Sequence, residues 1–541
     1  MVLETESRTD VLAATSVSAD RLATLADRVD ADGTDTIDVR APATDAEIGE
    51  IPDCAGSDVE RAVDRARAAQ STWTETSIDE RREILDRFGD LVLQHRAELL
   101  DILQLETGKS RRHAVEEVLD VAMTCSYYAD RGDAALGEDR RRGVFPHATT
   151  ARVTYEPVGV VVAISPWNYP LTLSLTDVLP ALIAGNTVVL KPDEKTPYTA
   201  LALADLLERA GLPEGCFEIV TGRGATVGPA LIDRVDYVSF TGSTETGQLV
   251  AEQAGRNLIG CSLELGGKNP LIVLDDADIE EAARGAVQAC FANAGQLCLA
   301  AERIYVADAI ADEFVEAFVA ATEELTLGTG FDFADDVGSL IDGDQLERVE
   351  RHVEDARERG ATVLTGGERR PDAGPFCYEP TILTDLEPEA TAACEETFGP
   401  VVAVESVPTV ATAIRKANDS EYGLNASVWT GNPKRGVAVA REIDCGTVCV
   451  NDAYISGWAA VDAPMGGFGD SGLGRRHGPE GIERYLEPRT IATSRIGPLD
   501  APPSVPTAWY ARGMFALTRL QHRLPTVSSV KRRLREAASG D

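Results

Sequence analysis

Residues 160–191 read VVVAISPWNYPLTLSLTDVLPALIAGNTVVLK. Two short runs rich in Val enclose a longer apolar stretch, residues 171–184, whose apolar positions recur at helical spacing. The same order continues with an amphipathic stretch at 198–210 and short apolar runs at 217–220 and 235–240. Strands that alternate with helices predict a parallel sheet with right-handed crossover connections. A ligand of such a sheet is expected at the carboxyl ends of its strands.

The whole chain has 541 residues, which is too long for a single hydrophobic core. Residues 59–103 show helical spacing ahead of the first strand. A second series of strands and helices begins at 271–274 and continues to Ala460. We therefore expect two α/β domains that face each other across a cleft.

The charge balance is strongly acidic, because 51 Lys and Arg residues stand against 89 Asp and Glu residues, a net charge of −38. Such a field repels nucleic acids and anionic membranes, which argues against polyanionic partners for the main body. Only seven of the basic residues are Lys. An acidic surface with little Lys is favoured in concentrated salt, where repulsion is screened. We predict a salt-adapted protein, against the alternative of an ordinary acidic one.

Cysteine and histidine usage argues against a metal centre. The ten cysteines show no zinc-type or redox-type spacing, and the six histidines are scattered. We expect reduced thiols and no catalytic metal. Residues 1–20 lack the features of a signal peptide, and no apolar stretch is long enough to cross a bilayer. These features favour a cytoplasmic protein.

Cys298 and Glu264 are the two residues whose surroundings suggest chemistry. Cys298 follows Gly295 just beyond an expected helix at 280–291, where backbone N–H groups are free to face a ligand. Glu264 precedes a Gly-Gly pair, so the backbone beside it can be approached closely. A thiol that attacks a carbonyl and a carboxylate that activates water give a covalent and then hydrolytic mechanism. Taken alone, Cys298 is better explained as a buried thiol and Glu264 as a solvated carboxylate.

Several separated motifs support the chemical interpretation. In chain order they are Pro166-Trp167-Asn168, Lys191-Pro192-Asp193-Glu194, Phe240-Thr241-Gly242-Ser243 with Gly247, Glu264-Leu265-Gly266-Gly267-Lys268, Gly295-Gln296-Leu297-Cys298, Glu396-Thr397-Phe398-Gly399-Pro400, and Pro464-Met465-Gly466-Gly467 with Ser471-Gly472-Leu473-Gly474-Arg475. With these motifs the chain resembles the aldehyde dehydrogenase superfamily from about residue 45 to about residue 495. The resemblance implies an α/β fold with a Rossmann-type cofactor domain, an α/β catalytic domain and a small β oligomerisation element.

The resemblance also implies a role for each motif residue. Cys298 is the expected nucleophile, Glu264 the base that deprotonates the hydrolytic water, and Asn168 a donor to the oxyanion. A helix that opens at Ser243 would accept the pyrophosphate of a dinucleotide. The expected cofactor contacts are Ser165, Trp167, Lys191, Glu194, Gly224, Gly242, Ser243, Gly247, Leu265, Glu396 and Phe398.

Glu194 bears on the choice of cofactor. A carboxylate at the adenosine ribose accepts hydrogen bonds from the hydroxyls and repels a 2′-phosphate, which favours NAD over NADP. NADP stays open, because Lys191 could equally pair with that phosphate.

The substrate is expected to leave as a free carboxylic acid, because coenzyme A-acylating members of the superfamily lack the base found here at Glu264. The motifs around Cys298 and Arg475 are similar to bacterial succinate-semialdehyde dehydrogenases, so succinate semialdehyde is the expected substrate. Better-understood members hold the substrate carboxylate with two arginines, and Thr176 and Ala292 stand at those places.

Two alternatives to this substrate assignment stay open. A broad dehydrogenase of apolar aldehydes would use a tunnel whose candidates, equally explained as core packing, are Leu173, Leu297, Leu299, Tyr454 and Trp458. A non-catalytic structural relative is the alternative from another class, but such chains usually lose the nucleophile or the base.

The expected domain boundaries follow from composition and from the resemblance. They are a mobile acidic N-terminus at 1–35, an NAD-binding domain at 36–139 and 158–264, an oligomerisation element at 140–157 and 475–498, a catalytic domain at 265–474 and a C-terminal extension at 499–541. We expect a homodimer or homotetramer.

The C-terminal extension is basic and amphipathic. One helical face could hold Tyr510, Met514, Leu517 and Leu524 beside several arginines. We expect this helix to pack on the acidic body of its own oligomer rather than on a membrane surface.

Overall fold

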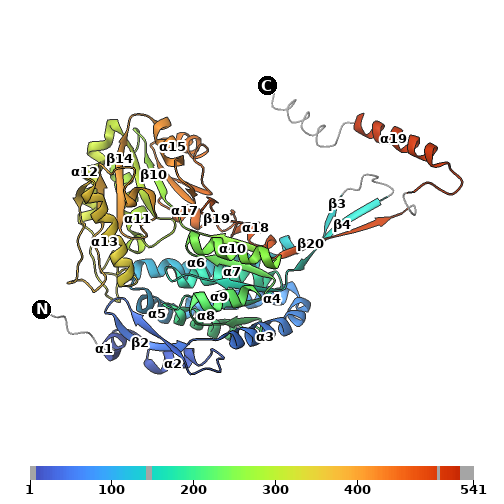
Figure 1. Ribbon diagram of the computed structural model, residues 1–541, viewed down its shortest axis with the longest axis horizontal. Helices are drawn as coiled ribbons and strands as arrows, with labels where there is room; N and C mark the ends of the chain where they lie inside the picture. The colour runs from blue at the N-terminus through green and yellow to red at the C-terminus, as the bar shows by residue number, and fades with distance from the viewer. Residues whose placement is uncertain (1–7, 142–148, 496–499, 524–541) are drawn as a thin grey trace. The chain divides into compact units, whose positions relative to one another are not determined.

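The computed structural model describes residues 8–141, 149–495 and 500–523 (Figure 1). The chain divides into a main unit, drawn from Met1–Gly137 and Glu156–Glu487, and a smaller unit, drawn from Glu138–Tyr155 and Pro488–Asp541. The main unit contains two large sheets, which Figure 1 shows in separate parts of that unit.

Residues 160–191 supply two adjacent strands of the first sheet. Its spatial order is β19 (Gly472–Leu473), β9 (Gly260–Glu264), β8 (Tyr237–Thr241), β5 (Val160–Ile164), β6 (Thr187–Lys191) and β7 (Phe217–Ile219). Strands β5 to β9 are parallel and β19 runs antiparallel to β9. The chain passes from β5 to β6 on one side and later reaches β8 on the other. The order therefore reverses between β5 and β8, which is where open α/β sheets bind ligands.

Helices surround this sheet. Those that precede it are α3 (Gly56–Glu75), α4 (Ile78–Gln94), α5 (Arg96–Thr107) and α6 (Arg111–Leu136), and those between its strands are α7 (Pro170–Ile183), α8 (Pro197–Arg209), α9 (Gly224–Ile232) and α10 (Thr244–Asn257). All residues of α7 are buried, and α6 packs against both α4 and α7. This packing brings α6 close to the segment that links β5 to α7.

The second sheet includes β11 (Ala301–Ala307), the strand that follows Cys298 in the chain. Its spatial order is β12 (Thr362–Thr365), β13 (Thr381–Thr384), β14 (Val401–Val407), β11, β10 (Asn269–Val273), β16 (Asn425–Trp429) and β17 (Thr447–Val450), all parallel except β12. Its main helices are α11 (Ile279–Phe291), α12 (Ala311–Glu323), α13 (Gly343–Glu358), α15 (Val410–Asn418) and α16 (Pro433–Ala440). Phe291 stacks on Phe318 of α12 with 6.0 Å between ring centroids, which fixes the end of α11 that leads to Cys298.

The predicted mobile N-terminus at 1–35 is wrong for its described part. Residues from Arg8 onward form α1 (Arg8–Ala13) and α2 (Ala19–Ala26), followed by the hairpin β1 (Thr36–Ala41) and β2 (Ala46–Pro52). Leu22 and Leu25 share one face of α2 and are fully buried. Arg21 pairs with Glu98 and Asp205. The prediction rested on the acidic and polar composition of this segment and did not recognise the helical spacing of Leu22 and Leu25.

The smaller unit contains a three-stranded sheet in the order β20 (Leu486–Ser494), β4 (Thr149–Pro157) and β3 (Asp139–Arg141). The predicted second piece of the oligomerisation element began at 475, but the structure keeps 475–487 in the main unit. The reason is that Arg476 and Arg484 both pair with Asp177 of α7, and all three are buried or nearly so.

The C-terminal extension forms α19 (Thr507–Arg523), on which Trp509, Phe515 and Leu520 are exposed. Leu524, predicted on its apolar face, lies outside the described residues. Within the described ranges, every helix is too short or too polar to cross a membrane.

Candidate functional site

A cavity of about 230 Å³ gathers the predicted catalytic residues of the main unit. It lies where the segments that follow β5, β8 and β9 meet the segment that precedes β11. Of the predicted site residues, it is lined by Trp167, Asn168, Gly242, Ser243, Glu264, Leu265, Cys298, Glu396 and Phe398.

Glu264 is the last residue of β9 and is buried. Neither of its carboxylate oxygens has a hydrogen-bond partner among the described residues. Burial raises the pKa of Glu264 to about 7, with the Arg476 guanidinium acting in the opposite direction. A carboxyl group with this pKa, free of hydrogen bonds, suits proton transfer near neutral pH.

Cys298 follows a tight loop that begins where α11 ends. Asn293, Ala294 and Gly295 adopt left-handed backbone conformations with φ of 51°, 54° and 72°. A side chain at Gly295 would meet the Gly399 carbonyl oxygen at 2.0 Å, so only glycine fits there. Burial raises the pKa of the Cys298 thiol to about 12, and the Glu396 carboxylate acts in the same direction. The thiol is therefore protonated at neutral pH until positive charge enters the cavity.

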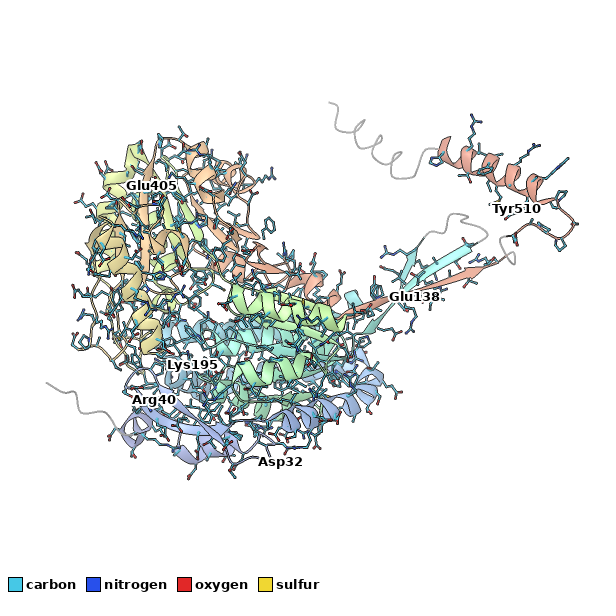
Figure 2. The ribbon with its side chains drawn as sticks, in the orientation of Figure 1. Asp32, Arg40, Glu138, Lys195, Glu405 and Tyr510 are labelled. Carbon is cyan, nitrogen blue, oxygen red and sulfur yellow. The ribbon has the colours of Figure 1, made fainter. Side chains whose placement is uncertain are left out.

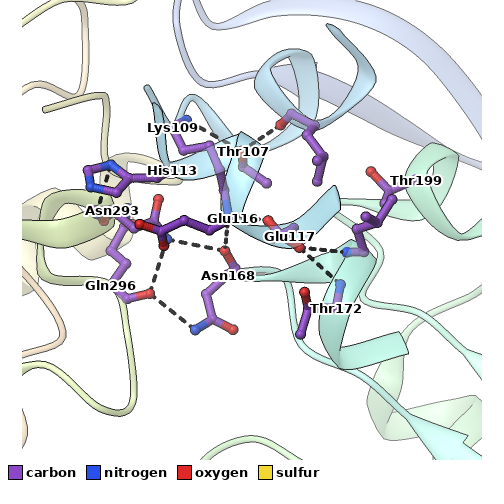
Figure 3. Close-up of polar contacts among 12 residues, drawn as sticks. Thr107, Lys109, His113, Glu116, Glu117, Asn168, Thr172, Thr199, Asn293 and Gln296 are labelled. Carbon is purple, nitrogen blue, oxygen red and sulfur yellow. Dashed lines mark hydrogen bonds and ion pairs between the residues drawn. The ribbon is translucent and has the colours of Figure 1, made fainter. Parts of the chain in front are cut away.

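Asn168 is held next to the Cys298 loop by a hydrogen bond. Its side-chain Nδ2 donates to the Gln296 carbonyl oxygen at 3.1 Å (Figure 3). The amide of Asn168 and the thiol of Cys298 line the same cavity, which suits Asn168 as an oxyanion donor.

The dinucleotide motif opens α10. Ser243 is its N-cap, and Ser243 Oγ accepts from Thr246 N at 3.3 Å. The first N–H groups of a helix lack intrahelical partners and favour an anion. A side chain at Gly247 would meet Leu265 at 2.4 Å, so α10 approaches β9 closely. Gly242 and Ser243 line the first cavity where α10 begins, which suits them to contact a phosphate group.

Lys191, Glu194 and Gly224 lie close to one another and do not line the first cavity. Lys191 Nζ donates to Glu194 Oε2 at 2.9 Å, and a side chain at Gly224 would lie 3.7 Å from that Nζ. Burial alone would raise the pKa of Glu194, but the paired Lys191 more than offsets this and lowers it. Glu194 is therefore ionised. Ser165 follows β5, but its hydroxyl bonds with Ser174 of α7 at 2.9 Å and does not line the cavity.

Glu396 and Phe398 form one wall of the cavity. Phe398 meets Trp167 edge to face at 5.5 Å, and Lys195 (labelled in Figure 2) lies 5.7 Å from the Trp167 ring centroid. Glu396 Oε1 accepts from Gly267 N at 2.9 Å, and burial raises the pKa of Glu396 to about 7.

Two residues of α13 that the sequence did not single out support this wall. Arg348 Nη2 donates to the Glu396 carbonyl oxygen at 2.6 Å, and Gln345 Nε2 donates to the Phe398 carbonyl oxygen at 2.8 Å. Both also line the cavity.

A second cavity, of about 180 Å³ and mostly apolar, is lined by Leu297, the residue that precedes Cys298. The predicted tunnel residues Leu297, Tyr454 and Trp458 line it. Three acidic residues of α6 that the sequence did not reveal line it as well, Glu116, Glu117 and Asp120.

The polar groups of this second cavity are carboxyls. Tyr454 OH donates to Glu116 Oε2 at 3.1 Å, and Trp458 Nε1 donates to Asp120 Oδ1 at 2.7 Å. Burial raises the pKa of Glu116 and that of Asp120 to about 7. No Lys, Arg or His is found among the described residues that line it.

The remaining tunnel candidates lie elsewhere. Leu173 lines the first cavity, and Leu299 is buried in the core of the second sheet's domain. Thr176 and Ala292, at the places of the expected arginines, are buried and line neither cavity. Across the described ranges, no cluster of His, Cys, Asp or Glu has the make-up of a metal site.

Three buried lysines stand out once their contacts are known. Lys109, Lys191 and Lys268 are all buried, in a chain whose basic residues are mostly Arg. Lys109 contacts the Asn168 segment, Lys191 contacts Glu194, and Lys268 pairs with Glu302, which accepts from Phe398 N at 3.0 Å. The rarity of Lys was the one sequence signal that pointed to Lys109.

Comparison with known proteins gives one family. The model of the aldehyde dehydrogenase family matches residues 29–491. A protein of Mycobacterium ulcerans, provisionally named an NADP-dependent succinate-semialdehyde dehydrogenase, is 49% identical over 497 residues, which cover 92% of this chain and 96% of the relative. The NADP-dependent succinate-semialdehyde dehydrogenase of Escherichia coli is 39% identical, covering 85% of this chain and 94% of the relative.

Solved structures give the same result. A crystal structure titled as an E. coli NADP-dependent enzyme superposes with a TM-score of 0.83 at 38% identity, covering 86% of this chain and 96% of that one. The betaine aldehyde dehydrogenase of Staphylococcus aureus in complex with NAD+ superposes with a TM-score of 0.82 at 34% identity, covering 87% of this chain and 93% of that one.

Proposed function

The chain belongs to the aldehyde dehydrogenase family, and on that premise we propose that it oxidises succinate semialdehyde to succinate with NAD(P)+ and water. The observation that carries the chemistry is the convergence of Cys298, Glu264 and Asn168 on one cavity. The names of the Mycobacterium and Escherichia relatives support the choice of aldehyde.

The first half of the reaction needs a nucleophile and an oxyanion site. The Cys298 thiol releases its proton to water, the resulting thiolate attacks the aldehyde carbon, and the Asn168 amide and the Cys298 N–H stabilise the negative oxygen of the thiohemiacetal. Bound NAD(P) would supply the acceptor for the hydride that leaves this carbon and a positive charge near the thiol. Ser243, Lys191, Glu194 and Glu396 would hold it.

The second half of the reaction releases the acid. Glu264 takes a proton from water, which attacks the thioester carbon and expels the Cys298 thiolate. The pKa of Glu264, raised to about 7 by burial, leaves enough carboxylate at neutral pH and a strong enough base for this step. The product is a free carboxylic acid, and each turnover yields one reduced cofactor.

We propose NAD as the preferred cofactor, although the named relatives are NADP-dependent. The proposal is supported by the ionised carboxylate of Glu194. Lys191 Nζ donates to Glu194 Oε2 at 2.9 Å, so this lysine already has a partner and is not free to bind a 2′-phosphate. A carboxylate at this position repels a 2′-phosphate and accepts hydrogen bonds from ribose hydroxyls.

The second cavity favours one competing substrate class. Its lining combines apolar side chains with Glu116 and Asp120, a setting that suits uncharged aldehydes better than a carboxylate. A screen of cofactor reduction with succinate semialdehyde, glutarate semialdehyde, propanal and benzaldehyde decides between a substrate that carries a carboxylate and an uncharged aldehyde. We expect the highest kcat/KM with succinate semialdehyde, and a preference for propanal or benzaldehyde would contradict the substrate assignment.

Assembly and location are further proposals. We propose a homodimer or homotetramer, supported by β20, whose residues are exposed at every position after Leu486. All ten cysteines are described and free, which supports a reducing cytoplasm. Size-exclusion chromatography of the full chain and of a chain ending at residue 500 tests the assembly and the role of α19.

A further inference from the structure

Lys109 and Glu117 form a buried ion pair outside the motifs of the proposed mechanism (Figure 3). Lys109 lies between α5 and α6, and Glu117 lies on α6. Both side chains are completely shielded from solvent. A buried pair is expensive to desolvate, and apolar replacements are often equally stable. A role other than stability is therefore worth seeking in what the pair contacts.

The pair forms hydrogen bonds to the backbone of residues 168–172 at two points. Lys109 Nζ donates to the Asn168 carbonyl oxygen at 2.7 Å and lies 3.9 Å from the Tyr169 ring centroid. Glu117 Oε2 accepts from Leu171 N at 2.8 Å and from Thr172 N at 3.1 Å, in the first turn of α7. The backbone on both sides of the oxyanion donor is thereby tied to one charged pair.

The same carbonyl is also tied to the nucleophile loop. Asn293 Nδ2 donates to the Asn168 carbonyl oxygen at 3.1 Å and to the Gln296 carbonyl oxygen at 3.1 Å. The Asn168 side chain returns to that Gln296 oxygen at 3.1 Å. Asn293 itself has a left-handed backbone, a conformation that needs support from its surroundings.

We propose that Lys109 and Glu117 are positioning residues for the oxyanion site: they fix the Asn168 carbonyl, and through it the spacing between the Asn168 amide and the Cys298 loop. The proposal rests on the proposed function of Asn168. Neither residue lines the first cavity, which holds Cys298 and Glu264, whereas Glu117 lines the second cavity. Misplacing a catalytic group by about 1 Å typically costs about a hundredfold in rate.

The test uses the full chain and compares Lys109→Met, Asn168→Ala and their double variant with wild type. One readout is the rate of first-turnover cofactor reduction with succinate semialdehyde. The other is release of 4-nitrophenol from 4-nitrophenyl acetate without cofactor, which needs the thiol and the oxyanion donors but no particular aldehyde. Lys434→Met, on the exposed start of α16, is the matched control.

We expect each single variant to lower both rates by about a hundredfold and the double variant to be no slower than the worse single one, because both remove the same interaction. The KM for the cofactor should stay within about twofold of wild type. Losses that multiply in the double variant, or a Lys109→Met protein with wild-type rates, would overturn the proposal.

A neutral pair guards against misfolding, because Lys109→Met alone leaves Glu117 buried without its cation. The Lys109→Met/Glu117→Gln protein should keep the wild-type melting temperature within a few degrees and still lose about a hundredfold in both rates. Wild-type rates in this folded protein would refute the positioning role. If wild type releases nitrophenol but reduces no cofactor with succinate semialdehyde, the substrate proposal fails while the nitrophenol rates still decide this one.

Discussion

Two cavities, one lined by Cys298 and the other by its neighbour Leu297, differ in the hydrogen bonding of their carboxyl groups. The first holds Glu264, whose carboxylate has no hydrogen-bond partner among the described residues and which lines the same cavity as Cys298. In the second, Glu116 and Asp120 are each hydrogen-bonded to an aromatic side chain. Burial raises the pKa of all three carboxyls to about 7. Burial therefore shifts the three pKa values alike, and the difference between the two cavities lies in the hydrogen bonds of the carboxyl groups.

Removing the Cys298 thiol should abolish aldehyde oxidation, whichever cavity holds the rest of the substrate. Cys298→Ala is expected to lower aldehyde oxidation by roughly 10⁴-fold or more, because no covalent adduct can form. Cofactor binding, measured by fluorescence quenching, should be unchanged. Cys394→Ala, which removes an exposed thiol, is the matched control. Residual turnover above one per cent of wild type would contradict the assignment of the nucleophile.

The first cavity was largely predictable from sequence, and the second was not. Glu264, Cys298 and Asn168 each sit in a short motif at the end of a strand or helix, where local chain geometry decides their position. Glu116 and Asp120 lie on α6, more than 150 residues before Cys298, and reach the site only through helix packing. No local pattern marks them.

Burial also separates what was predicted from what was missed. The alternation of strands and helices specified the first sheet, because its strands are continuous apolar runs. The mobile N-terminus was a wrong prediction, because a single helical face with Leu22 and Leu25 is hidden in an acidic sequence. Lys109 was missed because its contact with the Asn168 carbonyl oxygen spans 59 residues of sequence, and only the scarcity of Lys marked it.

The pH dependence should distinguish the two halves of the reaction in the first cavity. The carboxylate form of Glu264 predominates above its pKa of about 7 and is lost as the pH falls below it. Steady-state kcat should therefore fall about tenfold for each pH unit below 7, when hydrolysis limits turnover. The first-turnover burst, which needs no base at Glu264, should fall less. A burst and a kcat that decline together would place the titrating group elsewhere.

Cofactor choice should be adjustable without any effect on the second cavity. Glu194→Ser removes the charge that repels a 2′-phosphate and frees Lys191. The ratio of kcat/KM for NADP to that for NAD should rise about tenfold, which corresponds to about 1.4 kcal/mol. The KM for succinate semialdehyde should not change. Glu252→Gln, on the exposed face of α10, is the matched control, and an unchanged ratio in Glu194→Ser would count against NAD preference through this residue.

The smallest expected effect belongs to the second cavity. Glu116→Gln keeps the shape and the contact with Tyr454 but removes a negative charge. The KM for succinate semialdehyde should fall about threefold through weaker repulsion, while the KM for propanal stays constant. A rise in the KM for succinate semialdehyde would mean that its carboxylate does not approach this cavity.

Hydrolysis by Glu264 is the central claim, and Glu264→Gln tests it most directly. The variant keeps the size of the side chain and lacks the base. Mixed rapidly with NAD+ and succinate semialdehyde, it should release one equivalent of reduced cofactor per active site and then stop, with the acyl group detectable on Cys298 by mass spectrometry. Steady turnover at the wild-type rate, with no acyl-enzyme, would contradict the proposed mechanism.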